Sequence, residues 1–154
     1  MRPDRTHLAP ALLALTLALT ACVTRRTSTI VPALSGPGTS EAVEDVVRAA
    51  LRADAAGDPS ADTLYAPGAL IIANARVRLR TPRLAGVGYG GRISVASASA
   101  TMEGRFAWVL LDYRWVNVEA NTTATGRATV VCQLVEGWWR IVHLHSSQPL
   151  PWEP

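Results

Sequence analysis

The 154-residue sequence predicts an α+β domain in which one amphipathic helix packs against a mixed or antiparallel sheet. Three observations carry this prediction. Apolar residues recur at helical spacing over residues 40–57, and residues 92–147 alternate in the manner of β-strands. The pair Glu136-Gly137 then separates the last two strand patterns by a two-residue hairpin turn. Because 49% of the chain is apolar, a single domain of this length can build a core.

The N-terminal residues form a targeting segment rather than part of this fold. Arg2 and Arg5 precede an apolar run over residues 12–19 that is too short to span a bilayer. The run closes on Leu19-Thr20-Ala21-Cys22, which resembles the lipobox of bacterial lipoproteins. That resemblance implies cleavage before Cys22, acylation of its thiol and anchoring to a membrane of the cell envelope. The alternatives are a plain secretory signal or a short membrane anchor.

We therefore expect residues 1–21 to be a signal peptide and residues 22–39 to be a lipidated cysteine with a flexible tether. The tether is rich in Thr, Ser, Pro and Gly. Ser40 is the expected N-cap of the helix, and Gly57 is its expected end. The apolar stripe of this helix consists of Val43, Val46, Val47, Ala50 and Leu51.

The middle of the chain predicts short elements and a loop. A short helix is expected from Asp58 toward Tyr65, with Pro67-Gly68 ending it. Residues 69–73 and 76–80 predict two short strands, with arginines alternating outward on the second. Residues 81–91 predict a flexible loop, and its glycines do not form a phosphate site because no helix N-terminus follows them.

The last third predicts a meander of long strands over residues 93–102, 106–118, 128–135 and 138–147. Residues 119–125 are expected to be a polar connection. Prolines from residue 149 onward end the sheet, so the domain is expected to cover residues 40–148, followed by a Pro-rich tail at 149–154.

The hairpin turn at residues 136–137 fixes an expected register for the last two strands. Each step away from the turn moves one residue along both strands. This register places Val130 opposite His143 and Ala128 opposite His145. Because side chains alternate across a strand, both imidazoles are then expected on the apolar, core-facing side. The same side is expected to carry Cys132, Leu134, Trp139 and Ile141.

The net charge and the cysteine count exclude some classes of function and of covalent link. The net charge of +3 is spread along the chain without a basic patch, so no nucleic-acid partner is expected. Once Cys22 is lipidated, Cys132 is the only thiol, which excludes an intramolecular disulfide. Within an apolar strand pattern, a buried and inert thiol is expected.

Residues 137–147 (GWWRIVHLHSS) resemble the closing strand of SnoaL-like proteins. These belong to the nuclear transport factor 2-like superfamily, together with ketosteroid isomerases and kinase association domains. The helix, Gly57-Asp58 and Tyr65-Ala66-Pro67 are similar to the family's opening, so the resemblance covers residues 40–147. It implies a cone-shaped, curved sheet wrapped around N-terminal helices (a cystatin-like roll), an interior pocket and, usually, homodimerisation through the sheet.

Two departures from the family modify that expectation. The loop at residues 81–91 stands where the family has a third helix, so helix content is reduced, and the pocket is either more open or roofed by the loop. Kinase association domains also place pocket arginines on the two strands before the last. The matching residues here are Leu110 and Val130, so a ligand carboxylate held by arginines is not supported.

Asp112 and the two histidines are the candidate chemical groups. Asp112 is the only acid in an apolar strand, where desolvation would raise its pKa and suit it as a general base. The resemblance places Trp108 and Asp112 on the pocket side. The alternative for Asp112 is an ion pair with one of the arginines Arg114, Arg127 and Arg140. His143 and His145 either polarise a carbonyl or hydrogen-bond within the core, and H-x-H alone predicts no metal site.

Three functions remain open, because this fold hosts many activities. The first is a lipid-anchored homodimer that binds a small apolar or amphipathic molecule or a partner protein, without a cofactor. Its pocket would be lined by Tyr65, Trp108, Cys132 and Trp139. The second is an isomerase-type enzyme, with Asp112 as general base and either His143 or His145 polarising a carbonyl. The third is a structural dimerisation module with a filled cone.

Overall fold

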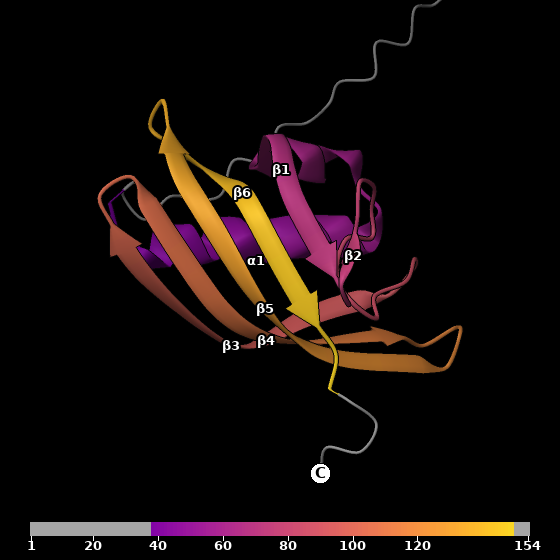
Figure 1. Ribbon diagram of the computed structural model, residues 1–154. Coiled ribbons are helices and arrows are strands. Elements are labelled where there is room, and N and C mark those ends of the chain that lie inside the picture. Colours follow the sequence, from indigo (N-terminus) through magenta and orange to yellow (C-terminus); the bar gives the residue numbers. More distant parts are fainter. Residues whose placement is uncertain (1–37, 150–154) are drawn as a thin grey trace, which may run out of the picture.

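The computed structural model describes residues 38–149, which form a six-stranded sheet with a long helix across one face (Figure 1). The predicted signal, nearly all of the tether and most of the tail lie outside these residues. The elements in chain order are α1 (Ser40–Ala56), the 3₁₀ helix η1 (Pro59–Leu64), β1 (Tyr65–Ala73), β2 (Arg76–Val77), β3 (Arg92–Glu103), β4 (Phe106–Asn117), β5 (Thr122–Val135) and β6 (Trp138–Ser147).

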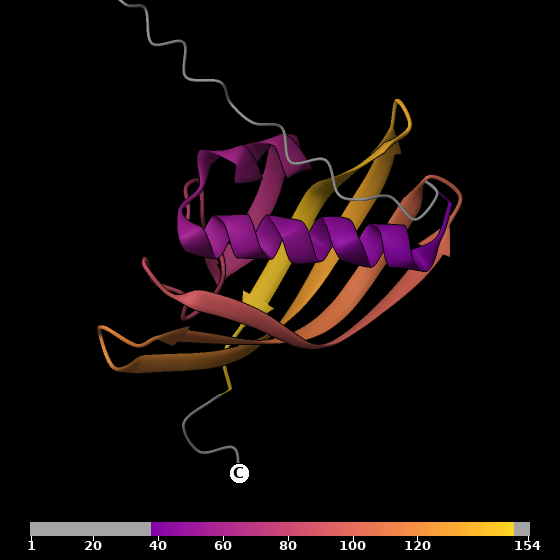
Figure 2. The same ribbon diagram turned by 180° about the vertical axis from the view of Figure 1, so that it is seen from behind.

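The sheet has the strand order β2-β1-β6-β5-β4-β3. Strands β1 and β6 run parallel, and every other neighbouring pair is antiparallel, so the sheet is mixed. It curves around α1, which lies in its concave side (Figure 2). We call the side that faces α1 the inner face and the opposite side the outer face. The predicted α+β fold, with a curved sheet packed on an N-terminal helix and few helices, is confirmed.

Helix α1 forms where the apolar stripe predicts it. All five stripe residues are buried against the sheet. The N-cap is Thr39 rather than Ser40, since the Thr39 hydroxyl accepts a hydrogen bond from the Ala42 N–H at 3.2 Å. Gly57 ends the helix in the left-handed conformation, with φ of 69°.

Three predicted strand boundaries are wrong. Strand β5 begins at Thr122, so most of the expected polar connection is strand; its threonines stay exposed because β5 extends past the end of β6. Strand β1 begins at Tyr65 and continues through Pro67-Gly68, where its pairing with β6 is interrupted and no ladder hydrogen bond is required of the proline. Strand β2 is only Arg76–Val77.

The middle of the loop at residues 78–91 packs into the concave side of the sheet, whereas the sequence predicted a flexible loop. Leu84 and Ala85 are each only 1% exposed. The Tyr113 hydroxyl donates to the Ala85 carbonyl at 2.7 Å, and the Ala85 N–H donates to the Ser146 hydroxyl at 2.9 Å. The loop therefore roofs the cone on the side where the resemblance implied a third helix.

Close approach by Tyr113 explains one glycine in β5. A Cβ at Gly126 would overlap the Tyr113 ring and lie 2.8 Å from the Ser147 carbonyl oxygen. The absence of a side chain there lets Tyr113 reach the loop, and so couples the sheet to residues 78–91.

Two tyrosine substitutions test whether this loop belongs to the core. Tyr113→Phe leaves the buried Ala85 carbonyl without its donor, and we expect a loss of about 1–3 kcal/mol in the free energy of unfolding. Tyr89→Phe is the matched control, because the Tyr89 hydroxyl also donates to a loop carbonyl, that of Thr81 at 2.6 Å, but in an exposed position. We expect the control to change stability by less than about 0.5 kcal/mol. Equal losses in denaturant titrations of the two variants would show that the loop is not an integral part of the core.

Candidate functional site

A β-bulge in β6 decides where the two histidines point. The β5–β6 register follows the prediction from Val135 opposite Trp138 to Cys132 opposite Ile141. It then shifts by one residue, so His143 lies opposite Val131 and His145 opposite Thr129. The predicted pairing with Val130 and Ala128 is wrong. An extra residue in one strand exchanges the faces of all residues beyond it, and both histidines therefore lie on the outer face.

Burial of Leu144 explains the bulge. With the shift, Leu144 and Ser146 occupy the inner face and are 0% and 1% exposed. Without it, two imidazoles would be buried there and Leu144 would face outward. Burying an aliphatic side chain is favourable, whereas burying an imidazole without partners is not.

Trp108 and Asp112 also lie on the outer face, so the prediction that they face the interior is wrong. The burial pattern of β4 places their neighbours Val109 and Leu111 inward. Asp112 forms the ion pair that the sequence left as an alternative: it accepts hydrogen bonds from Arg127 Nε at 2.8 Å and from the Ser97 hydroxyl at 2.9 Å. These bonds lower the pKa of the Asp112 carboxyl, the reverse of the rise that the prediction required.

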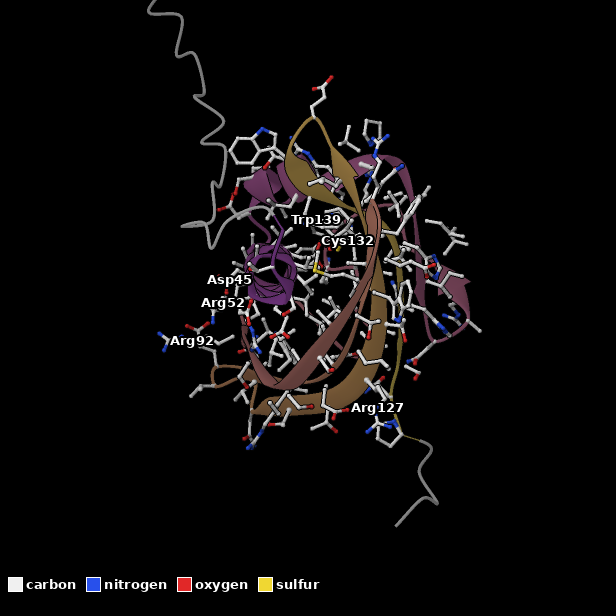
Figure 3. The ribbon with its side chains drawn as sticks, turned by 90° about the vertical axis from the view of Figure 1, so that its left-hand side faces the viewer. Asp45, Arg52, Arg92, Arg127, Cys132 and Trp139 are labelled. Atoms are coloured by element: carbon white, nitrogen blue, oxygen red, sulfur yellow. The ribbon has the colours of Figure 1, made fainter. Side chains whose placement is uncertain are left out.

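Cys132 and Trp139 are on the inner face, as predicted, but they pack in the core. Figure 3 shows both between α1 and the sheet, while Arg127 lies on the opposite side of the sheet. They are 0% and 4% exposed. Burial raises the pKa of the Cys132 thiol to about 12, so the thiol stays protonated and unreactive at neutral pH.

The structure brings together a partly buried charged cluster that the sequence did not predict. It consists of Asp54 on α1, Asp62 on η1, Tyr65 at the start of β1 and Arg83 in the loop. The Asp54 carboxylate is fully buried and accepts from the Arg83 backbone N–H at 2.6 Å and from its Nη1 at 2.9 Å. The other guanidinium nitrogen, Nη2, donates to Asp62. The guanidinium carbon lies 4.5 Å from the centre of the Tyr65 ring, in cation–π contact.

Desolvation and pairing compete in this cluster. Burial raises the pKa of Asp54, and the hydrogen bonds from Arg83 oppose that rise. For Arg83, burial lowers the pKa, but the bonds to Asp62 and Asp54 outweigh it and the guanidinium stays charged. Burial also raises the pKa of the Tyr65 phenol. The Tyr65 hydroxyl is shielded from solvent and has no hydrogen-bond partner among the described residues.

One sequence signal could have identified the cluster. Asp54 stands seven residues after Val47, on the continuation of the apolar stripe of α1. An acid on a core-facing stripe requires a buried partner. The sequence does not show which of the arginines that partner is.

An open cleft of about 390 Å³ lies beside the cluster. Of the four predicted pocket residues, Tyr65 lines this cleft. Asp62, Arg78 and Arg83 give it polar walls, whereas Ile71 and Leu79 give it apolar ones. Such a mixture suits an amphipathic molecule better than a wholly polar one.

The described residues contain no group of three His, Cys, Asp or Glu side chains that could hold a metal ion. Among residues 38–149, no helix is long and apolar enough to cross a membrane.

The outer face carries a patch of exposed apolar side chains. Leu110, Phe106 and Leu70 are 51%, 46% and 47% exposed, although each is a large hydrophobic residue. One row of cross-strand neighbours runs from Trp108 through Val131 and His143 to Leu70. We call Leu70, Phe106, Trp108, Leu110 and Val131 the outer apolar patch.

Comparisons with known proteins agree with this fold. A SnoaL-like domain model matches residues 43–151, whereas no curated protein matches the chain. A nuclear transport factor 2-like superfamily protein from Salmonella enterica is 20% identical, with a TM-score of 0.57 over 74% of this chain and 93% of that one.

Two further solved structures are similar. A protein with a cystatin-like fold from Nostoc punctiforme is 11% identical, with a TM-score of 0.60 over 75% of this chain and 96% of that one. A nuclear transport factor 2-like protein from Novosphingobium aromaticivorans is 13% identical, with a TM-score of 0.59 over 73% and 82%. At these identities the likeness shows a shared fold.

Substitutions at the two acids of the cluster should differ in effect. Asp54→Ala leaves the Arg83 charge in the core without its buried partner, and we expect a loss of about 3–5 kcal/mol in unfolding free energy. Asp62→Ala removes a carboxylate that is 64% exposed, and we expect a loss below about 1 kcal/mol. Denaturant titration of both variants measures the difference. A small effect at Asp54 would contradict the role assigned to the buried pair.

Proposed function

The chain belongs to the SnoaL-like domain family. We propose that it is a lipid-anchored binding module of the bacterial cell envelope that pairs with a second copy of itself. The observation that carries the pairing is the outer apolar patch. The proposed organisation is a signal over residues 1–21, an acylated Cys22 with a tether to residue 39, the domain over 40–148 and a tail over 149–154.

The patch has the composition of an interface. Its large apolar side chains come from neighbouring positions on β1, β4 and β5. The paired charges Asp112 and Arg127 border it. Exposed apolar patches bordered by polar residues mark interaction surfaces, and a two-fold axis brings one patch against its own copy.

A small amphipathic molecule in the cleft beside Tyr65 is a second candidate function. The specific observation in its favour is that Tyr65 lines the cleft while its hydroxyl is buried without a hydrogen-bond partner among the described residues. A ligand that displaces the side chains over it would gain a hydrogen bond that the protein itself does not make.

Catalysis by Asp112 with His143 or His145 gains no support from the geometry. The Asp112 carboxylate is held by Arg127 and Ser97, which lower its pKa and make it a weaker base. All three side chains lie on the outer face, which the proposed pairing would cover.

Native mass spectrometry of residues 23–154 tests the pairing. We expect a dimer for the unchanged protein. For Leu110→Glu we expect the dimer dissociation constant to rise about hundredfold or more, because each of two facing copies would bury a carboxylate. Val118→Glu is the matched control, since Val118 is also an exposed apolar residue but lies at the tip of the β4–β5 hairpin, outside the outer apolar patch. A monomer at every concentration, or no difference between the variants, would refute the pairing. The same spectra show any retained small molecule.

The anchor has a separate test. Cys22→Ser removes the thiol that would be acylated, so we expect the protein to leave the membrane fraction of cells and appear in the soluble fraction. Persistence in the membrane fraction would contradict acylation at Cys22.

A further inference from the structure

The large hydrophobic residues that the described chain exposes fall into two groups. Leu70, Phe106, Leu110 and Trp138 lie on the outer face. The other four gather at one end of the molecule and are more exposed than any in the first group: Val77 60%, Leu79 84%, Tyr89 64% and Val118 85%. We call these four residues the exposed rim.

Two hydrogen bonds connect the segments that carry the exposed rim. The Tyr89 hydroxyl donates to the Thr81 carbonyl at 2.6 Å, which holds Tyr89 beside the segment that follows β2. Asn117, next to Val118, donates its side-chain N–H to the Tyr89 carbonyl at 2.9 Å. The rim thus joins β2, the loop and the tip of the β4–β5 hairpin, which lie at the right-hand end in Figure 1 and at the left-hand end in Figure 2.

Arginines surround these apolar side chains. Arg76, Arg78 and Arg80 alternate with Val77 and Leu79, and all are exposed. None of the three arginines has an ion-pair partner among residues 38–149. A hollow of about 410 Å³ lies between Arg78, Arg80 and Tyr89.

Few acids offset this charge. Glu119 is in the turn of the β4–β5 hairpin, and the exposed Asp58, next to Gly57, accepts a hydrogen bond from the Ser60 N–H. Asp62, in the cleft near Arg78, is already paired with Arg83. Arg92 adds a further exposed cation at the start of β3, opposite Val116 near the same hairpin tip. The rim is therefore cationic as well as apolar.

We propose that the exposed rim docks onto the headgroup layer of an anionic phospholipid membrane. A guanidinium group can donate two parallel hydrogen bonds to the oxygens of one phosphate. Each basic residue near an anionic bilayer also strengthens membrane binding severalfold. Leu79 and Val118 enter the boundary between headgroups and acyl chains, and Tyr89 lies at the depth that aromatic side chains favour. The hollow between Arg78 and Arg80 takes a headgroup phosphate.

The surroundings of the two apolar groups favour a lipid surface here. On the outer face the neighbouring charges are of both signs, as in the ion pair of Asp112 with Arg127, which suits a protein surface. At the rim the arginines have no partners and require an anionic one. Lipid phosphates supply that charge over the whole breadth of the rim.

The proposed acyl anchor brings the rim within reach of a bilayer, and for that proximity this inference rests on the proposed function. Residues 22–39 extend to at most about 60 Å. Helix α1, with 17 residues, is only about 25 Å long and leads from Thr39 toward the rim end, where Gly57 lies beside the Tyr89 ring. Tethering makes the second contact intramolecular, so a weak docking surface suffices.

A fluorescent reporter at residue 79 tests the docking. Full-length protein carrying Leu79→Cys is labelled with an environment-sensitive dye and reconstituted in phosphatidylcholine vesicles with or without phosphatidylglycerol. Cys132 is buried with a raised pKa and Cys22 is acylated, so the dye reacts with the new thiol. Glu103→Cys is the control, because Glu103 is exposed at the opposite end of the molecule, before the β3–β4 turn.

We expect a blue shift and quenching by lipid-attached quenchers for the dye at 79 in phosphatidylglycerol vesicles, and neither for the dye at 103. Replacing Arg76, Arg78 and Arg80 by Gln should lower the ratio of docked to undocked rim about fivefold for each arginine. High salt should weaken the docking in the same way.

Several outcomes would overturn the proposal: water-like emission at 79 in both kinds of vesicle, equal signals at 79 and 103, or an undiminished signal in the triple variant. Flotation of the vesicles reports separately on the anchor. If the protein does not float, Cys22 is not acylated and is a second reactive thiol. Leu79→Cys and Glu103→Cys are then each combined with Cys22→Ser, labelled, and titrated with phosphatidylglycerol vesicles from solution. A blue shift at 79 and not at 103 then supports docking without an anchor, and its absence refutes it.

Discussion

The carboxylate of Asp54 is fully buried between α1 and the loop at residues 78–91. A fully desolvated charge is tolerated only with a partner, and Arg83 supplies both a backbone N–H and a guanidinium. That pairing fixes the loop against α1, so Leu84 and Ala85 enter the core where the family has a helix. The same guanidinium holds Asp62 and covers Tyr65, which shapes the wall of the cleft.

Sequence periodicity predicted the elements well because it reports local geometry. The stripe of α1 and the two-residue turn at 136–137 depend only on neighbouring residues, and both are confirmed. The bulge in β6 depends instead on which side chain the whole core can bury, and no local pattern encodes the preference for Leu144. In β4 alternation was uninformative, because the outer residues Phe106, Trp108 and Leu110 are as apolar as the inner ones.

The candidate site was predictable only in part, for a related reason. Tyr65 was named from its resemblance to the family opening, and it does line a cleft. Its partners come from three separate elements, and Asp54 and Arg83 are 29 positions apart, so their pairing exists only in the folded chain. The acid on the apolar stripe of α1 was the one sign of a buried pair. Asp112, by contrast, was expected to be buried because its strand is apolar. It lies on the outer face instead, where it forms an exposed ion pair with Arg127.

The outer apolar patch and the exposed rim face different directions, so one protein can occupy both at once. Figure 1 looks onto the outer face, and the rim forms its right-hand edge. When two outer faces meet, the two-fold axis lies between them. An axis that points toward the rim sets both rims on the same side of the dimer, so that one bilayer binds both together with two acyl anchors. An axis at right angles to this sets the rims at opposite ends, where a single bilayer can contact only one. Pairing and docking therefore reinforce each other only in the first arrangement, and the orientation of the dimer determines how firmly the domain is held against the membrane.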